Sequence, residues 1–275
     1  MALISIDTES CIKDGLCRTA CALNLIEYTK GNFPKPIPNI ETECIRCGHC
    51  VAVCPTRSLD HIDLPLDECV EIDREFELKE EEVIQFIKSR RTARNFKDKA
   101  VSRPIIEKVL DITRFAPTGH NDQDVRWSIF DKKEDIKALA DSTIDFFEFL
   151  IETKGDNVLP FSLKDHIDLY KNGNDVILRD APVLMIAHGS KDRPMTNISC
   201  YIALTTLELA AKGCGLGTCW AGLFMFSVLS EYKPLLDLID LPKDQRFYGA
   251  MMMGYPILNY KRIPVRKKPL ISWKS

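Results

Sequence analysis

The sequence lacks the features that would mark an exported, membrane-spanning or nucleic-acid-binding protein. Residues 1–14 contain no basic patch and no apolar core of signal-peptide length. The longest apolar stretch, residues 219–229, is too short to span a bilayer. The formal net charge of -3 offers no excess of positive charge for nucleic acid or an acidic membrane. We therefore expect a soluble, cytoplasmic protein without a nucleic-acid or membrane partner.

Cysteine is scarce in most of the chain and dense at its N-terminal end. Residues 70–275 contain three of the 11 cysteines, and residues 1–69 contain the other eight. Without a secretory signal, such a dense group is more typical of metal binding than of disulfides. The same segment cannot bury enough apolar area to fold by packing alone, and a bound cluster would supply the missing stability. We therefore predict two domains, residues 1–75 held by metal and residues 76–275 held by an ordinary core.

Residues 44–55 follow the spacing C-x2-C-x2-C-x3-C-P, which is the cysteine run of bacterial ferredoxins. Three thiolates on a tight loop can hold three irons of one cubane cluster, and the fourth cysteine is directed to a second cluster. Gly48 lets the backbone approach the inorganic sulfides closely. The alternative is a zinc site, but zinc typically uses two C-x2-C pairs set well apart. The run therefore predicts that iron–sulfur clusters are bound by Cys44, Cys47, Cys50 and Cys54.

Residues 11–21 are a degenerate copy of this run. Overlaying the two places Asp14 where the second cysteine is expected, and Ala22 where the proline is expected. In the crossed arrangement of two-cluster ferredoxins, each run gives its last cysteine to the other cluster. The first cluster would then use Cys11, Cys17 and Cys54, with Asp14 as the candidate fourth ligand. The second cluster would use Cys44, Cys47, Cys50 and Cys21.

Asp14 leaves the nature of the first cluster open. A carboxylate is a harder ligand than a thiolate, and iron–sulfur clusters prefer thiolate. The first cluster is therefore either a 4Fe-4S cluster with an Asp ligand or a 3Fe-4S cluster, and a third interpretation leaves Asp14 facing solvent. Cys69 lies outside both runs, and we predict that it is a free, buried cysteine.

Apolar periodicity in the second domain predicts more helices than strands. Helices are expected over residues 78–88, 103–115 and 197–212, the last of them apolar nearly all round and therefore central and buried. Strands are expected over residues 126–130, 182–188 and 247–254. Because strands and helices do not alternate regularly, we predict an α+β fold rather than a doubly wound one. A mobile helical flap over a site is one interpretation of residues 131–180.

Three segments of the second domain suit a phosphorylated flavin. Residues 88–103 hold seven basic residues and one acid, and arginine forks fit a phosphate dianion, although a solvated helix end is the alternative. Residues 116–123, A-P-T-G-H-N-D-Q, are rich in small and amide residues, and an ordinary loop is the alternative. Residues 213–222 begin with three glycines at alternate positions, which let backbone N–H groups approach a ligand. Because this is not G-x-G-x-x-G after a strand, a dinucleotide fold is not supported.

Taken in order, these motifs resemble the nitroreductase family. The matching patterns are R-R-T-x-R-x-F, A-P-T-G-H-N-x-Q, G-L-G-T-C-W-x-G and G-Y-P before a basic C-terminus, over roughly residues 78–268. The N-terminal part resembles two-cluster bacterial ferredoxins. The two resemblances imply a small ferredoxin-like iron–sulfur domain followed by an α+β nitroreductase-like FMN domain. They also imply a homodimer in which residues of both subunits bind FMN at the interface.

The resemblance implies a role for each motif. The FMN phosphate and ribityl chain would be held by Arg90, Arg91, Thr92 and Arg94, with Arg266 and Lys268 approaching from the C-terminal segment. The isoalloxazine ring of the other subunit's flavin would face Pro117, Thr118, Gly119 and Asn121. Near the ring N5 would lie Trp220, Ala221 and Gly222, with a backbone N–H as the donor. The sequence departs from the family at Asp124, where a proline is common, and at Ala221, where many members carry Glu.

The two halves together predict an oxidoreductase active in electron transfer. Clusters pass single electrons, and FMN can accept single electrons and pass on two. A reduced external ferredoxin or similar donor would charge the clusters, which would reduce FMN and then a nitro, quinone or activated C=C acceptor. The alternatives are a non-enzymatic electron carrier or redox sensor, and a nitroreductase fed by NAD(P)H with structural clusters. No catalytic side chain is assigned; His120 is a candidate acid, although a lone loop histidine is more often a surface residue.

Overall fold

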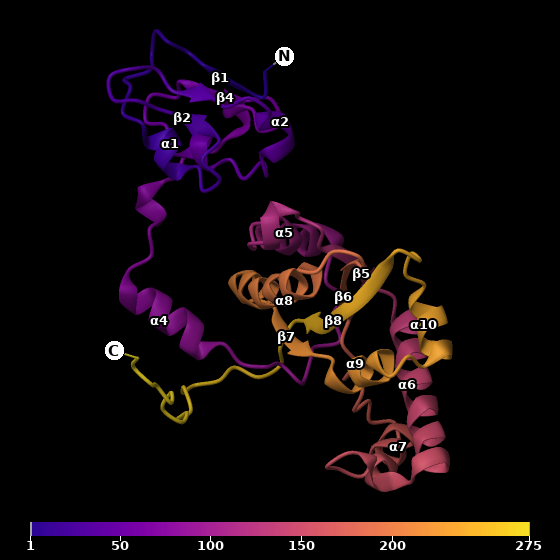
Figure 1. Ribbon diagram of the computed structural model, residues 1–275. Coiled ribbons are helices and arrows are strands. Elements are labelled where there is room, and N and C mark those ends of the chain that lie inside the picture. Colours follow the sequence, from indigo (N-terminus) through magenta and orange to yellow (C-terminus); the bar gives the residue numbers. More distant parts are fainter. Residues whose placement is uncertain (1, 275) are drawn as a thin grey trace. The chain divides into compact units, whose positions relative to one another are not determined.

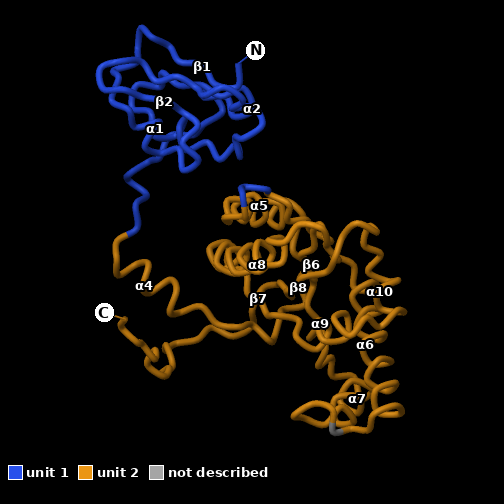
Figure 2. The backbone as a smooth tube through the Cα atoms, in the orientation of Figure 1, with its two compact units in different colours: residues 1–78, 120–122 blue, residues 79–119, 123–275 orange. Residues whose placement is uncertain are grey.

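The computed structural model describes residues 2–274, which form two compact units (Figure 2). Unit 1 runs from the N-terminus to Leu78 and also includes His120–Asp122. Unit 2 comprises Lys79–Gly119 and the chain from Gln123 onward. Within the described residues, no helix combines the length and the apolar character needed to cross a membrane.

Unit 1 is built from short elements around a small core (Figure 1). Strand β1 (Ile4–Ile6) pairs antiparallel with β4 (Leu59–His61), and β2 (Ile26–Glu27) pairs with β3 (Lys35–Pro36). The helical segments are α1 (Leu16–Ala20), α2 (Ile40–Glu43), α3 (His49–Ala52), η1 (Leu66–Glu68) and η2 (Arg74–Phe76). The buried core consists of Leu3, Ile4, Cys17, Leu25, Ile26, Ile40, Val51 and Leu59. A core this small agrees with the expectation that packing alone does not stabilise this part of the chain.

The backbone of unit 1 repeats itself with an offset of 33 residues. Gly15 and Gly48 both adopt left-handed conformations, with φ of 75° and 73°, and they immediately precede α1 and α3. Two residues earlier, Lys13 and Arg46 have φ of 59° and 53°. These matching turns follow equivalent cysteines of the two runs, Cys11 and Cys44. The degenerate first run therefore keeps the backbone course of the intact second run, although Asp14 replaces a cysteine.

Unit 2 contains a four-stranded antiparallel sheet in the order β5-β6-β8-β7. The strands are β5 (Arg126–Phe130), β6 (Val183–Ser190), β7 (Gly217–Trp220) and β8 (Gln245–Gly254). The helical segments are α4 (Glu80–Ser89), α5 (Arg103–Thr113), α6 (Lys133–Lys154), η4 (Asp156–Val158), α7 (Leu163–Lys171), α8 (Thr196–Gly213), α9 (Gly222–Leu229) and α10 (Lys233–Ile239). The short turn η3 (Gly119–Asn121) has its first residue in unit 2 and its other two residues in unit 1. This mixed architecture confirms the predicted α+β fold.

The two central strands carry buried residues on both faces, and each face supports a separate core. Along β6, Leu184 and Ile186 pack with residues of α6, α9 and α10, whereas Met185 and Ala187 pack with residues of α5 and α8. Side chains alternate between the two faces of a strand, so one apolar strand can serve both layers. Figure 1 shows the resulting arrangement, with α5 and α8 on one side of the sheet and α6, α9 and α10 on the other.

The predicted helices and strands of unit 2 are present within a few residues of their expected ends, but two expectations were wrong. Helix α8 is not buried all round, because Ile198 and Tyr201 are 45% and 43% exposed in the single chain. Cys69 is exposed, because it follows the surface turn η1 instead of entering the core of unit 1.

A buried polar cluster lies at one end of the central strand β6. His188 is 5% exposed, and its Nε2 is 3.1 Å from the Ser128 hydroxyl. The Gln245 amide nitrogen donates to His188 Nδ1 at 3.0 Å, and its oxygen accepts from Arg126 at 2.7 Å. Nδ1 therefore accepts a hydrogen bond, which fixes the neutral tautomer with the proton on Nε2. Burial lowers the pKa of His188.

The pKa of His188 predicts a specific pH dependence of stability. Below pH about 6.5 the unfolded histidine binds a proton that the folded protein resists, so the free energy of unfolding should fall on acidification toward the folded pKa. This slope cannot exceed about 1.4 kcal/mol per pH unit for one proton. Urea unfolding of the wild type and of His188→Gln at several pH values measures it. The variant should be less stable at neutral pH and should lack this part of the slope; equal slopes would contradict the prediction.

Candidate functional site

Two small cavities in unit 1 gather the cysteines in the crossed arrangement that the sequence predicts. The first, of about 20 Å³, is lined by Cys11, Asp14, Cys17 and Cys54, together with apolar and hydroxyl side chains. The second, of about 40 Å³, is lined by Cys21, Cys44, Cys47 and Cys50, together with His61 and apolar side chains. Each cavity thus takes three residues from one run and the last cysteine from the other. All eight candidate ligands line one cavity or the other.

The cysteine sulfurs of these cavities accept hydrogen bonds from the surrounding chain. Backbone N–H groups of Leu25, Arg46 and Ser58 donate to Cys21, Cys44 and Cys54 at 3.3, 3.4 and 3.3 Å. Burial raises the pKa of Cys54, but hydrogen bonds from Ser58 and Thr56 outweigh it, and the net pKa is lowered. Burial raises the pKa of Cys50 to about 11. These thiols therefore differ in how readily they become thiolates, the form that binds iron.

The arrangement suits a cluster better than a single ion. Among residues 2–274, no group of three or more His, Cys, Asp or Glu side chains is close enough to hold one metal ion. Four ligands instead surround a cavity, as expected where a multi-iron cubane separates the thiolates. Asp14 lines the first cavity but is also exposed in the single chain, and its Oδ1 accepts from the Leu16 N–H at 3.1 Å.

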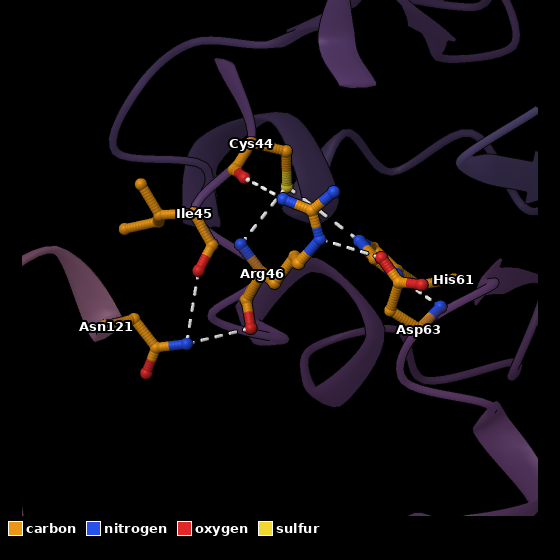
Figure 3. Close-up of polar contacts among 6 residues, drawn as sticks. All are labelled: Cys44, Ile45, Arg46, His61, Asp63 and Asn121. Carbon is orange, nitrogen blue, oxygen red and sulfur yellow. Dashed lines mark hydrogen bonds and ion pairs between the residues drawn. The ribbon is translucent and has the colours of Figure 1, made fainter. Parts of the chain in front are cut away.

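Polar contacts hold the loop between Cys44 and Cys47 (Figure 3). Arg46 Nε donates to Asp63 at 2.7 Å, and Arg46 Nη1 donates to the Cys44 carbonyl at 3.1 Å. The Asn121 amide, within unit 1, donates to the carbonyls of Ile45 and Arg46 at 3.1 and 2.9 Å (Figure 3). Asn121 has left-handed backbone geometry, with φ of 55°. Its side-chain donors are therefore committed to this loop in the single chain.

A cavity of about 260 Å³ in unit 2 combines basic side chains with the glycine-rich strand. It is lined by Ser89, Arg90, Arg91, Ala93, Arg94, Asn95, Glu208, Lys212, Leu216, Gly217, Thr218, Pro256, Leu258, Asn259 and Tyr260. The backbone brings these segments together: the Ala93 N–H donates to the Thr218 carbonyl at 2.9 Å, and the Ile257 N–H to the Asn95 carbonyl at 3.1 Å. The predicted basic motif and the predicted glycine motif thus share one cavity.

The arginines of this cavity are not equivalent. Arg90 is paired with Glu208 at 2.9 Å, and both side chains are largely buried. Arg91 donates from Nη1 to the Arg90 carbonyl, but its buried Nε and Nη2 atoms have no hydrogen-bond partner in the structure. A buried, unpartnered guanidinium edge is costly unless an acceptor satisfies it. Its two free N–H groups form the fork that binds a carboxylate or phosphate.

Lys212 adds a second basic group to the cavity. Its Nζ donates to the Ser89 hydroxyl at 2.6 Å and to the Phe86 carbonyl. Burial lowers the pKa of Lys212, and the charge of Arg90 lowers it further. A bound anion beside Lys212 would offset both effects by favouring the protonated amine.

The other predicted flavin contacts are dispersed in the single chain. Thr92 does not line the basic cavity, although both of its neighbours do, and Arg266 and Lys268 lie in an exposed C-terminal segment. In the loop after α5, the Gly119 N–H donates to Ser199 at 3.3 Å, and Thr118 Oγ1 accepts from Gln123. His120 is exposed in the single chain. The structure therefore brings together the basic motif and the glycine motif, but not the loop after α5 or the C-terminal segment.

The backbone contacts around Ala221 limit which residue can donate the N–H hydrogen bond expected near the flavin N5. The Ala221 N–H donates to the Ala250 carbonyl at 3.1 Å, so it is already occupied. Gly222 is the first residue of α9, where a helix has no internal acceptor for its N–H groups. Trp220 is half-buried and packs near Tyr201, with ring centroids 6.2 Å apart. The N–H of Gly222 therefore has no acceptor within its own helix, whereas that of Ala221 is occupied.

The model of the nitroreductase family matches residues 87–255 of this chain. The chain belongs to the nitroreductase family. A second family model, a 4Fe-4S dicluster domain, matches residues 3–55. The protein is therefore a nitroreductase-type oxidoreductase with a 4Fe-4S domain, and both predicted resemblances are confirmed. A protein of Archaeoglobus fulgidus provisionally named NADH dehydrogenase/NAD(P)H nitroreductase is 24% identical over 176 residues, which cover 64% of this chain and 86% of that protein.

Solved structures support the fold of this nitroreductase. A nitroreductase with bound FMN from Desulfitobacterium hafniense is 17% identical, with a TM-score of 0.56 over 72% of this chain and 100% of that one. An oxidized iodotyrosine deiodinase bound to FMN and 3-iodo-L-tyrosine is 21% identical, with a TM-score of 0.52 over 70% of this chain and 99% of that one. At these identities the likeness establishes the fold alone.

Several residues at the two sites were missed from the sequence. His61, Glu208 and Lys212 are isolated in the chain and carry no motif, and only the fold brings them to the cavities. Glu208 and Lys212 are four residues apart near the end of α8, so both face the basic segment. This four-residue spacing was the one feature of the sequence that could have indicated that the two side chains act together. Asp124 departs from the family pattern for a structural reason, because its carboxylate accepts the Ser190 N–H at 2.9 Å and pairs with Arg126.

Close packing at Gly217 predicts a sharp effect of a single methyl group. A Cβ at this position would lie 2.6 Å from the Ala93 Cβ, so Gly217→Ala should separate β7 from the basic segment and cost about 1–3 kcal/mol. The matched control is Gly213→Ala, where nothing lies within 4 Å and the added Cβ favours the helix. Thermal unfolding should show a lower Tm for Gly217→Ala only. Equal Tm values for the two variants would contradict this packing.

Proposed function

We propose that this protein passes electrons from a low-potential one-electron donor, such as reduced ferredoxin, through its clusters to FMN and on to a small organic acceptor. The observation that carries the proposal is the presence, in one chain, of two cysteine-lined cavities and a basic cavity with an unpartnered buried guanidinium, Arg91. Bound FMN would supply the two-electron chemistry, and the clusters would supply single electrons. Nitro, quinone and activated C=C compounds are the acceptor classes proposed.

The residues of unit 1 fit two clusters with different ligand sets. The cavity of Cys21, Cys44, Cys47 and Cys50 offers four thiolates for a 4Fe-4S cluster. The other cavity offers three thiolates and Asp14, which suits either an Asp-ligated 4Fe-4S cluster or a 3Fe-4S cluster. The two alternatives differ by one iron, and the position of Asp14 in the same cavity as the three cysteines supports a ligand role.

The residues of the basic cavity fit the phosphate of FMN. Arg91 presents two unpartnered donors, Arg94 and Lys212 line the same cavity, and Arg90 is held in place by Glu208. Thr92 follows Arg91 in the sequence, and its hydroxyl is proposed as a further hydrogen-bond donor to the phosphate. The Gly222 N–H is the proposed donor near the ring N5, with Trp220 and Ala221 alongside. The ring is proposed to face Pro117, Thr118, Gly119 and Asn121 of a second subunit.

Exposed apolar side chains support a homodimer. On α5 and just after it, Ile112 and Phe115 are 42% and 75% exposed, and on α8 Ile198 and Tyr201 are similarly exposed. A surface of this kind is typical of an interaction site. A second copy would bury it and would explain why α8 is apolar nearly all round. The exposed C-terminal segment would then carry Arg266 and Lys268 toward a flavin phosphate.

A second candidate keeps the enzyme and makes NAD(P)H the donor, with structural clusters. It is favoured by the names of the curated relatives from Archaeoglobus fulgidus and Methanothermobacter thermautotrophicus, both of which cite NADH and NAD(P)H. A non-enzymatic electron carrier or sensor remains the alternative of a different class, and would show no turnover of any acceptor. We propose a cytoplasmic location, where a reduced ferredoxin and reducing conditions are available.

Anaerobic reduction of the bound flavin separates the two donors. We expect reduced ferredoxin to bleach the flavin of the wild type rapidly, and at least about tenfold more slowly in Cys47→Ser, because loss of a ligand should disable a cluster. Cys69→Ser is the matched control, since Cys69 is exposed and outside both cavities. Stopped-flow absorbance with ferredoxin, NADH and NADPH gives the rates. Rapid bleaching by NADH, equal in all three proteins, would reject the ferredoxin route.

Substitution of Arg91 tests the phosphate site. Arg91→Gln removes a charge-assisted fork, worth about 1.5–3 kcal/mol, so the Kd for FMN should rise about 10–100-fold. Arg246→Gln is the matched control, because Arg246 is an exposed arginine on β8 that does not line the basic cavity. Fluorescence titration of the flavin-free protein measures both. An unchanged Kd in Arg91→Gln would place the phosphate elsewhere.

A further inference from the structure

We infer that His61 sets the reduction potential of the cluster bound by Cys21, Cys44, Cys47 and Cys50, by donating a hydrogen bond from its ring to the Cys44 sulfur. This inference rests on the proposed function, because it requires a cluster in that cavity. His61 carries no motif and is 1% exposed. Its Nε2 lies 3.8 Å from Cys44 Sγ (Figure 3).

The hydrogen bonds of His61 decide which ring nitrogen carries the proton. The backbone N–H of Asp63 donates to His61 Nδ1 at 3.1 Å. An Nδ1 that accepts a hydrogen bond carries no proton, so a neutral His61 must carry its proton on Nε2. Nε2–H is therefore the donor, and the Cys44 sulfur is the acceptor. A thiolate that ligates iron has no proton of its own and can act only as a hydrogen-bond acceptor.

The position of the ring is fixed by the backbone around it. His61 ends β4, where it pairs with Ile4 of β1, and its own N–H donates to Asp60 at 2.9 Å. Immediately after it, the Leu64 N–H donates to the His61 carbonyl at 2.9 Å. A ring held in a strand on one side and a tight turn on the other cannot easily swing away from Cys44. The donor is therefore in place before any electron arrives.

A preorganised donor on a ligand sulfur acts on the redox equilibrium. Reduction adds negative charge to the cluster and its thiolates, so an N–H aimed at a sulfur stabilises the reduced state more than the oxidised state. The other donors to cysteines of this cavity, Leu25 and Arg46, are backbone N–H groups that survive substitution. His61 is thus a positioning residue whose side chain raises the potential of one cluster, and it can be removed without altering a ligand.

The test is a redox titration followed by EPR on the intact protein with dithionite and mediators. In His61→Phe the equilibrium constant for one-electron reduction of this cluster should fall about tenfold, which corresponds to about 59 mV toward lower potential. His61→Gln keeps an N–H donor at a similar reach, so the potential of its cluster should lie between those of His61→Phe and the wild type. The potential of the Cys11, Cys17 and Cys54 cluster should stay unchanged and serves as an internal control.

His49→Phe is the matched control, because His49 lines the same cavity but is exposed. It should leave the potential unchanged. A potential in His61→Phe equal to or above that of the wild type would overturn the inference. Iron and sulfide counts that reveal no cluster on Cys44 in the wild type would instead overturn the proposed function, so the two failures are distinguishable.

A second measurement decides the case if His61→Phe does not assemble its cluster. Wild-type protein labelled with nitrogen-15 only in histidine rings is reduced, and pulsed EPR is used to detect coupling of ring nitrogen to the cluster. A coupling that persists in His49→Phe and disappears in His61→Gln supports the hydrogen bond. No ring coupling in the wild type overturns the inference, whatever the behaviour of the variants.

Discussion

Unit 1 depends on the requirement that thiolates surround two cavities at fixed positions. Its core contains eight buried apolar residues, which is little for a segment of this length. Short helices begin at left-handed Gly15 and Gly48, and these turns direct the ligands inward. In this account, bound clusters replace the missing apolar core, because binding free energy that exists only in the folded state adds directly to stability. The fold and the redox function of this unit then have the same physical origin.

Unit 2 is stabilised differently from unit 1. Its apolar central strands supply the core, and the basic cavity lies at an edge of the sheet. The central strands β6 and β8 are buried on both faces and divide the unit into two cores. Strand β7 lies at the edge of the sheet, where Gly217 allows the basic segment to pack within van der Waals contact. The site therefore uses an edge strand, whose outer backbone groups are accessible to a neighbouring segment.

The two halves of the sequence differ in how far they could be interpreted without a structure. The eight ligand candidates were found because cluster chemistry imposes a short, local spacing, and the same spacing predicted how they divide between two cavities. The basic motif and the glycine motif were found in the same way. Glu208, Lys212 and His61 were not, because each reaches its site through strand pairing or helix packing that no local pattern encodes. The predictions that α8 and Cys69 are buried were wrong for a related reason. Composition does not reveal which apolar side chains lack a partner within one chain.

The surroundings of the cysteines differ between the two cavities of unit 1. In the first cavity, Asp14 stands in place of a cysteine, Cys54 Sγ accepts from the Ser58 N–H at 3.3 Å, and the hydroxyls of Thr56 and Ser58 each lie 3.8 Å from that sulfur. In the second, four cysteines line the cavity, and the His61 ring lies 3.8 Å from Cys44 Sγ. Hydrogen bonds and ligand charge both shift cluster potentials, so a repeated backbone with different side chains would give two bound clusters different potentials. Such a difference would set the order in which two bound clusters accept an electron.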